Sequence, residues 1–215
     1  MKTVPKTVYQ YSELSEEAQE KARDWYREAS MGDNFFAEYV IEDAVRMGAL
    51  MGIEIDNRTW RNTNGHTGTE PKIWWSGFSS QGDGASFEGS YHYVKGAVKK
   101  IKAEANDGEL IRIAEQLQAI QKKYFYKLYA CVRRGAGSNY HSHSNTMSID
   151  VEYTGEDYRE VETSDEEDIA QLMRDFADWI YSNLEKEYEY QNSDTAVEET
   201  ILANEYEFNE DGTIA

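Results

Sequence analysis

The sequence predicts an α+β protein in which helices pack on one face of an antiparallel sheet of about five strands. Apolar residues recur at helical spacing in several segments, and other segments alternate apolar and polar residues as half-buried strands do. No internal repeat and no linker rich in Pro, Gly or Ser divides the chain. We therefore expect residues 1–215 to form a single compact domain.

Two helices are expected before residue 53. The first begins after Ser12 or Ser15, both of which are suitable N-caps. The second follows a polar break at residues 31–34. The apolar residues with helical spacing are Ala18, Ala22, Trp25 and Ala29 in the first helix, and Phe36, Val40, Ala44 and Met47 in the second.

The middle of the chain is expected to form much of the sheet. Residues 53–56 alternate as a strand does, whereas residues 61–71 are polar, contain glycine and are predicted to form a loop. Further strands are expected at residues 72–78 and 86–94. An Asp-Gly dipeptide at position 83 separates these two strands and is typical of a hairpin turn.

A helical stretch is expected to open near Gly96, with an interruption at residues 106–108. Its second part carries a clear apolar stripe, formed by Leu110, Ile113, Leu117 and Ile120. Residues 124–132 and 146–153 are then predicted to pair as a second hairpin, joined by a loop at residues 133–145.

The last long helix is predicted to begin at Ser164, where Glu167 completes a capping box. Its expected buried face consists of Ile169, Leu172, Met173, Phe176, Ile180 and Leu184. Residues 195–203 are expected to form a short helix, and residues 206–208 a short strand followed by a turn.

Charge is distributed unevenly along the chain. The whole sequence has 22 basic and 41 acidic residues, a net charge of −19. Residues 152–215, the acidic C-terminal helical region, hold 21 acidic and 3 basic residues. Residues 95–134 instead hold 10 basic and 4 acidic residues, a net charge of +6. Such asymmetry carries information about partners.

Three interpretations of this asymmetry are open. The acidic region can be a solvated surface that keeps the protein soluble. It can fold back over the basic residues 95–134 and be neutralised within the molecule. It can also be a negative face that steers the protein toward a basic partner, or imitates nucleic acid before a nucleic-acid-binding protein.

Composition excludes several function classes. No run of about 18 apolar residues occurs, so no membrane span is expected. The first residues lack the apolar segment of a secretory signal, and a single cysteine, Cys131, fits a reducing cytoplasm. The net charge argues against direct nucleic-acid binding, although lysines and aromatics interleave at residues 122–127 as in single-strand binders.

Catalytic signals are weak. Cys131 lies within an apolar segment, which is more typical of a small core residue than of a reactive thiol. No serine stands in a nucleophile-elbow pattern. His141 and His143 could begin a metal site if His92 or Asp150 supplied a third ligand, but no known spacing signature is present, so a polar loop is expected here and no metal site is predicted. We expect no enzymatic activity and no cofactor.

The most distinctive segment is the glycine-rich hairpin expected near residues 74–89. As a functional loop it could present backbone N–H groups to an anion, or hold a cation between Asp83 and Glu88. As a structural turn, its glycines supply positive φ angles and room for facing tryptophans. The hairpin residues of interest are Ser79, Ser80, Gln81, Gly82, Asp83, Gly84 and Glu88.

Two stretches resemble a family of small proteins from bacteriophages and bacterial mobile elements. They are residues 11–26 and residues 75–89, and the second is similar to the motif FSGFWSQGDGACFEG of that family. Members are often labelled antitoxins of a toxin–antitoxin stability system. The resemblance covers roughly residues 8–150 and departs from the motif at Ser79 and Ser86, where larger residues or cysteine are usual. It implies no particular functional residues.

Charge and resemblance together predict a non-enzymatic, phage-type protein of the bacterial cytoplasm that binds and neutralises a basic host or toxin protein. This antitoxin or anti-defence inhibitor could imitate nucleic acid. The partner-binding carboxylates are expected to be Asp165, Glu166, Glu167, Asp168, Asp175, Asp178, Glu185, Glu187 and Glu189. The alternative is an enzyme or sensor that uses the hairpin Gln81–Glu88 to bind a metal or small molecule.

Overall fold

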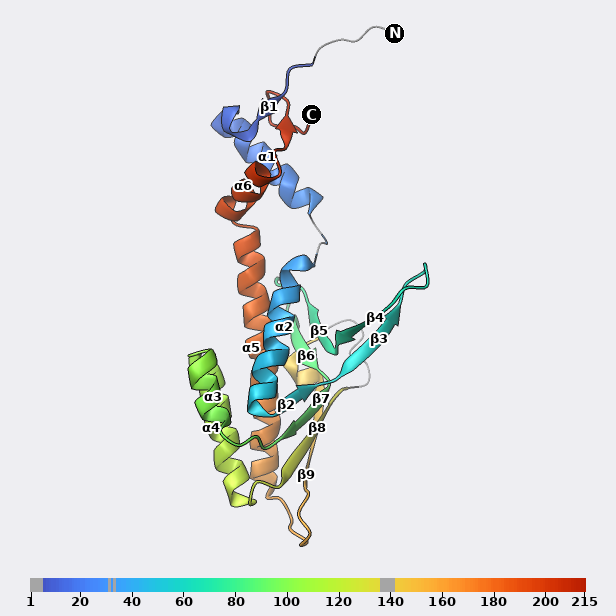
Figure 1. Ribbon diagram of the computed structural model, residues 1–215, viewed down its shortest axis with the longest axis vertical. Coiled ribbons are helices and arrows are strands. Elements are labelled where there is room, and N and C mark those ends of the chain that lie inside the picture. The colour runs from blue at the N-terminus through green and yellow to red at the C-terminus, as the bar shows by residue number, and fades with distance from the viewer. Residues whose placement is uncertain (1–5, 31, 33, 136–141) are drawn as a thin grey trace. The chain divides into compact units, whose positions relative to one another are not determined.

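The computed structural model describes residues 6–30, 32, 34–135 and 142–215 (Figure 1). The chain divides into two compact units. The terminal unit comprises Met1–Glu38 and Lys186–Ala215, and the central unit comprises Tyr39–Glu185. The single domain expected for residues 1–215 stays a prediction. No helix in the described part of the chain is both long and apolar enough to cross a membrane.

The terminal unit brings the two ends of the sequence together. Strand β1 pairs antiparallel with β10, and helices α1 and α6 pack beside this pair. Ser15 caps α1 by accepting a hydrogen bond from the Ala18 N–H at 3.3 Å, so Ser15 rather than Ser12 begins the helix. The elements that lie wholly within this unit are β1 (Tyr9–Gln10), η1 (Tyr11–Glu13), α1 (Glu16–Ala29), α6 (Asp194–Ala203) and β10 (Glu207–Phe208).

This unit has its own hydrophobic core. The Trp25 ring meets Tyr206 and Phe208 edge-on, with ring centroids 5.3 and 5.8 Å apart. Because these contacts join α1 to the last strand, the ends of the sequence stabilise each other. The buried members of the core are Tyr11, Leu14, Ala18, Ala22, Val197, Ile201 and Phe208.

The central unit is built on a four-stranded antiparallel sheet in the order β2-β7-β8-β9. Buried and less buried residues alternate along β8 and β9, which shows that helices cover one face. The predicted α+β class is therefore confirmed. The sheet strands are β2 (Ile53–Ile55), β7 (Gly89–His92), β8 (Leu128–Arg134) and β9 (Met147–Tyr153). The helices are α3 (Ala97–Glu104) and α4 (Gly108–Lys123), together with most of α2 (Phe35–Met51), which begins before Tyr39, and of α5 (Thr163–Gln191), which ends after Glu185.

The predicted loop at residues 61–71 is wrong at both ends, and only the turn at residues 62–66 remains of it. Strands β3 (Asn57–Arg61) and β4 (Thr67–Pro71) form a two-stranded sheet there. Every residue of β3 is exposed, so no hydrophobic alternation marks it in the sequence. The Asn62 side chain closes the turn by accepting hydrogen bonds from the backbone of Asn64 and His66.

The predicted strand at residues 86–94 is divided in two. Strand β6 (Gly84–Phe87) pairs with β5 (Ile73–Ser76) in a separate hairpin, and β7 joins the four-stranded sheet. The hairpin expected around Asp83 is thus confirmed. A Cβ atom on Gly89 would lie 2.0 Å from the carbonyl oxygen of Glu54, so only glycine fits where the chain changes sheets.

The strand expected at residues 124–132 begins later, at Leu128. Phe125 and Tyr126 adopt φ angles of 52° and 63°, in the left-handed region that few bulky residues occupy. The buried Gln121 side chain fixes this turn, because its amide donates to the Leu128 carbonyl at 2.8 Å and accepts from the Leu128 N–H at 3.1 Å. Strand β8 then pairs with β9, as the predicted second hairpin requires.

Candidate functional site

Asp83 closes the glycine-rich hairpin from within. Its carboxylate accepts hydrogen bonds from the backbone N–H groups of Ser79 and Ser80, at 3.1 and 2.6 Å. The Asp83 N–H donates in turn to the Ser80 carbonyl at 3.1 Å, and Gly82 supplies a φ angle of 102°. The bond from the Asp83 N–H to the Ser80 carbonyl is that of a β-turn, and the Asp83 carboxylate reaches back to the backbone N–H groups that precede it. The carboxylate that could have held a cation therefore orders the loop itself.

The remaining hairpin residues are divided between solvent and packing. Gln81 is exposed, whereas Gly84 is buried and lies so close to His143 that an added Cβ would be 2.4 Å from the His143 Cβ. Glu88 is half-buried and forms a 2.9 Å ion pair with Lys72. Burial is the largest single influence and would raise the pKa of Glu88, but the hydrogen bonds from Lys72 and from the Arg134 N–H, together with the charges of both residues, hold that pKa below its ordinary value.

Aromatic stacking fixes the hairpin to α5. Phe78 stacks between Trp75 and Tyr181, with ring centroids 5.5 Å apart on each side. The Tyr181 hydroxyl also donates a hydrogen bond to the Gly77 carbonyl at 2.9 Å. The motif thus has a clear structural role, which favours its interpretation as a packed turn.

The candidate metal ligands do not assemble among the described residues. His141 lies outside them. The His143 Nδ1 accepts a hydrogen bond from the Asn145 N–H at 3.1 Å, and His92 lies 3.9 Å from Glu54. In the described ranges, no group of three or more His, Cys, Asp and Glu side chains is arranged to hold a metal ion.

Asp165 does not belong to an exposed acidic face, contrary to the prediction. It is 1% exposed and accepts hydrogen bonds from Lys123 at 2.5 Å and from the Tyr124 hydroxyl at 2.8 Å. Burial by itself raises the pKa of this carboxyl. The hydrogen bonds from Lys123 and Tyr124, with the charge of Lys123, together lower the pKa by more, so it lies below the ordinary value. Asp165 therefore joins α5 to the end of α4.

The other predicted carboxylates of α5 differ in availability. Asp175 forms an ion pair with Arg112 of α4 and accepts a hydrogen bond from Gln171 at 2.7 Å. The acidic helix is thus partly neutralised by the basic middle of the chain, as one of the three interpretations of the charge asymmetry required. The exposed members are Glu167, Asp168, Asp178 and Glu189, and the half-buried ones are Glu166, Glu185 and Glu187.

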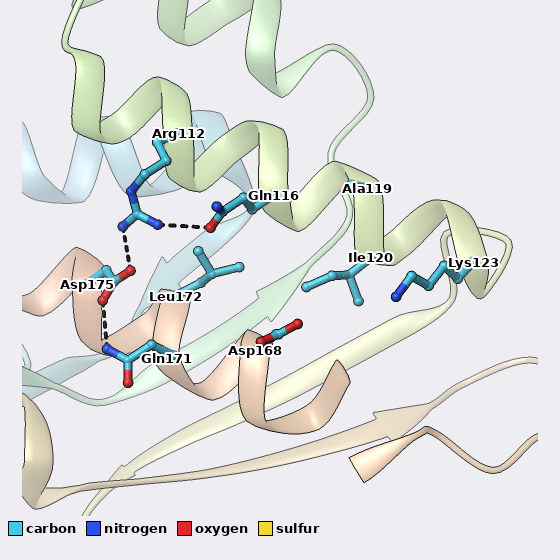
Figure 2. Close-up of a pocket in the computed structure, with 9 residues that line it drawn as sticks. All are labelled: Arg112, Gln116, Ala119, Ile120, Lys123, Asp168, Gln171, Leu172 and Asp175. Atoms are coloured by element: carbon cyan, nitrogen blue, oxygen red, sulfur yellow. Dashed lines mark hydrogen bonds and ion pairs between the residues drawn. The ribbon is translucent and has the colours of Figure 1, made fainter. Parts of the chain in front are cut away.

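A groove of about 300 Å³ lies between α4 and α5 in the central unit (Figure 2). Sequence reasoning missed it, although Arg112 and Asp175 each adjoin a buried apolar residue, which marks the edge of a packed helix face. Arg112 donates to Gln116 at 2.9 Å and closes one end with Asp175. The lining residues are Arg112, Gln116, Ala119, Ile120, Lys123, Asp168, Gln171, Leu172 and Asp175.

The two units differ in how their carboxylates are compensated. The central unit has 24 acidic and 16 basic residues, and the terminal unit has 17 acidic and 6 basic residues, a net charge of −11. In the described part of the terminal unit, the only carboxylates in ion pairs are Asp24 and Asp194. In that of the central unit, carboxylates paired with lysine or arginine are Asp43, Asp56, Glu70, Glu88, Glu104, Glu109, Glu115, Asp150, Asp165 and Asp175.

One model of a known protein family matches most of the chain. The model of a domain of unknown function, DUF8835, matches residues 36–194. The chain belongs to the DUF8835 family. No curated protein and no solved structure matches the chain. The DUF8835 match includes the hairpin, α4 and the groove, whereas α1 and almost all of α6 lie outside it.

Proposed function

We propose that this chain is a non-enzymatic inhibitor that binds a basic host or toxin protein through exposed carboxylates. It would act as an antitoxin or anti-defence protein and would occupy the partner's anion-binding surface, as nucleic acid does. The resemblance to phage and mobile-element proteins is consistent with this role.

The observation that carries the proposal is the uncompensated charge of the terminal unit. Residues 1–38 and 186–215 have 11 more acidic than basic residues, and few of the described carboxylates there form ion pairs. Exposed carboxylates of this kind raise association rates with a basic partner by ~10–10³-fold at low salt. They also lose little internal stabilisation when a partner covers them, because they have no internal cation to give up.

The structure redefines which carboxylates this proposal uses. Asp165 is buried and Asp175 is paired with Arg112, so neither is available. Glu187 and Glu189 of α5 belong to the terminal unit, and α6 adds the exposed Glu198 and Glu199. These four side chains are the test set.

The experiment compares two charge-matched variants. One replaces the test set by glutamine, and the control replaces Glu70, Glu104, Glu115 and Asp150 of the central unit by their amides. Basic proteins captured from host lysate on the full chain are identified by mass spectrometry, and their association rates are measured across a salt series. We expect rates that fall with salt and a loss of binding in the terminal variant alone. Salt-independent association, or equal effects of the two variants, would exclude the proposal.

The alternative of an enzyme or sensor at the hairpin Gln81–Glu88 has less support. Asp83 is bonded to the backbone of its own loop, and Glu88 is bonded to Lys72. A ligand that recruited either carboxylate would have to break contacts that order the hairpin.

A further inference from the structure

We propose that the groove between α4 and α5 binds a guanidinium or ammonium group carried on an unbranched aliphatic chain. The groove lies wholly within the central unit, so this inference does not rest on the proposed function of the terminal unit. Its volume of about 300 Å³ is at the lower end of the range of small-ligand sites, which suits one extended side chain or a short diamine.

The cations that line the groove are already compensated by the protein. Arg112 binds Glu109 at 2.6 Å and also pairs with Asp175. Lys123 binds Asp165 at 2.5 Å. An incoming anion would therefore have to displace a carboxylate from one of these pairs, which makes the groove a poor anion site.

Asp168 is the lining carboxylate that lacks a counterion. It is exposed, and its carboxylate forms no ion pair or hydrogen bond with any other residue that the structure describes. Figure 2 shows its carboxylate beside Ile120 and Leu172, with no dashed line to a neighbour. Each lining cation has a carboxylate partner of its own, Asp165 for Lys123 and Glu109 and Asp175 for Arg112, so the negative charge of Asp168 is left uncompensated. A cation is what this arrangement accepts.

The apolar lining selects the chain that carries the cation. Ile120 and Leu172 are 6% and 3% exposed and form an apolar surface with Ala119 between the polar ends of the groove. The aliphatic stems of lysine and arginine cover such surfaces while the charged head stays near water. The Gln171 amide N–H₂ donates to Asp175, so its carbonyl oxygen remains as an acceptor for a second N–H of the ligand.

The test is a methyl NMR titration of the full chain, observed at Ile120 and Leu172. The probes are agmatine, as a free amine, and N-acetyl-arginine amide, as a partner's side chain, with N-acetyl-norleucine amide as the uncharged control. We expect saturable shifts with a charged probe and none with the control. Tighter binding of agmatine would identify a free amine as the ligand, and equal or tighter binding of the arginine derivative would identify a protein side chain.

Three variants decide whether the groove is responsible. Asp168→Asn should weaken binding about three- to five-fold, the value of one partly exposed ion pair, and Ala119→Leu should abolish the shifts by filling the groove. Glu167→Gln removes the same charge from a neighbouring exposed position outside the lining and should leave binding unchanged. The absence of shifts at both methyl sites with the charged probes, or equal weakening by Asp168→Asn and Glu167→Gln, would overturn the inference.

Discussion

Replacing Ser86 by alanine is expected to stabilise the protein. Ser86 is 0% exposed, and its hydroxyl has no hydrogen-bond partner among the residues that the structure describes. It stands opposite Trp74 in the β5–β6 hairpin, within the segment that resembles the phage motif. That motif has cysteine at this position, and a thiol tolerates an apolar site better than a hydroxyl does.

The magnitude follows from the cost of a buried hydroxyl. An unsatisfied buried polar group destabilises the folded state by about 1–3 kcal/mol, so removing it is stabilising. Removing the oxygen atom also removes van der Waals contacts, and this loss offsets part of the stabilisation. We therefore expect Ser86→Ala to raise the free energy of unfolding by about 1 kcal/mol. With an m-value of about 2 kcal/mol/M in urea, the midpoint moves upward by about 0.5 M. Ser86→Cys should act in the same direction, less strongly if the larger sulfur is crowded.

Urea unfolding followed by tryptophan fluorescence measures this shift, and amide exchange along β6 shows whether it is local. The matched control is Ser76→Ala, because the Ser76 hydroxyl is bonded to both the N–H and the carbonyl of Ser142 at 3.3 Å. That variant should lose about 0.5–1.5 kcal/mol. If Ser86→Ala also lowers the midpoint, the hydroxyl is satisfied in solution and the reasoning is refuted.

Two further changes test the packing of the central unit. Asp165→Asn should cost about 1–3 kcal/mol at pH 7, because it leaves the buried contact to α4 without its charge. The pKa of Asp165 is lowered in the folded state, so its contribution to stability is present above the ordinary aspartate pKa and is lost as the pH falls through the folded value. In chemical denaturation between pH 7 and 2, the free energies of unfolding of wild type and variant should therefore converge at the acid end. As a control, the exposed Asp150→Asn should change the free energy of unfolding by less than about 1 kcal/mol at any pH. Gly89→Ala should lower the free energy of unfolding by more than about 2 kcal/mol, because the added Cβ would clash with backbone atoms. Gly108→Ala is the control, since nothing lies within 4 Å of the added Cβ, and it should leave the protein equally or slightly more stable in thermal unfolding. Equal destabilisation by the two variants would contradict the steric argument.

The elements that could be predicted are those with one buried face, because burial of one face spaces apolar residues regularly along the sequence. Helix α5 was located from the stripe that runs from Ile169 to Leu184, all of it buried in the structure. The β5–β6 hairpin followed from its Asp-Gly turn. Strand β3 was missed because all five of its residues are exposed. The split at Glu88 was missed because polar and apolar residues alternate across it in the sequence without a break, although β6 is buried at every residue and only β7 alternates in burial. Pairing between strands, rather than local pattern, decides both cases.

The candidate site was less predictable, because the sequence shows which residues are charged but not which residues lie next to them in the folded structure. Asp165 and Glu166 are adjacent acidic residues in one helical turn, yet Asp165 is bonded to Lys123 and Tyr124 from 41–42 positions earlier. The groove likewise depends on how α4 packs against α5. Asp168 is a candidate binding residue only because Arg112 and Lys123 are paired with other carboxylates, which the sequence does not show.

The position of Cys131 has a consequence for oxidation. It is the single cysteine of the sequence and lies in β8, between Ser90 and Asp150 on the neighbouring strands. Its side chain is half-buried, while Ala130 and Val132 beside it are buried on the opposite, helix-covered face. A disulfide between Cys131 residues of two copies would therefore form on the less buried side of the sheet, and a thiol-reactive dye would mark that side at one defined point.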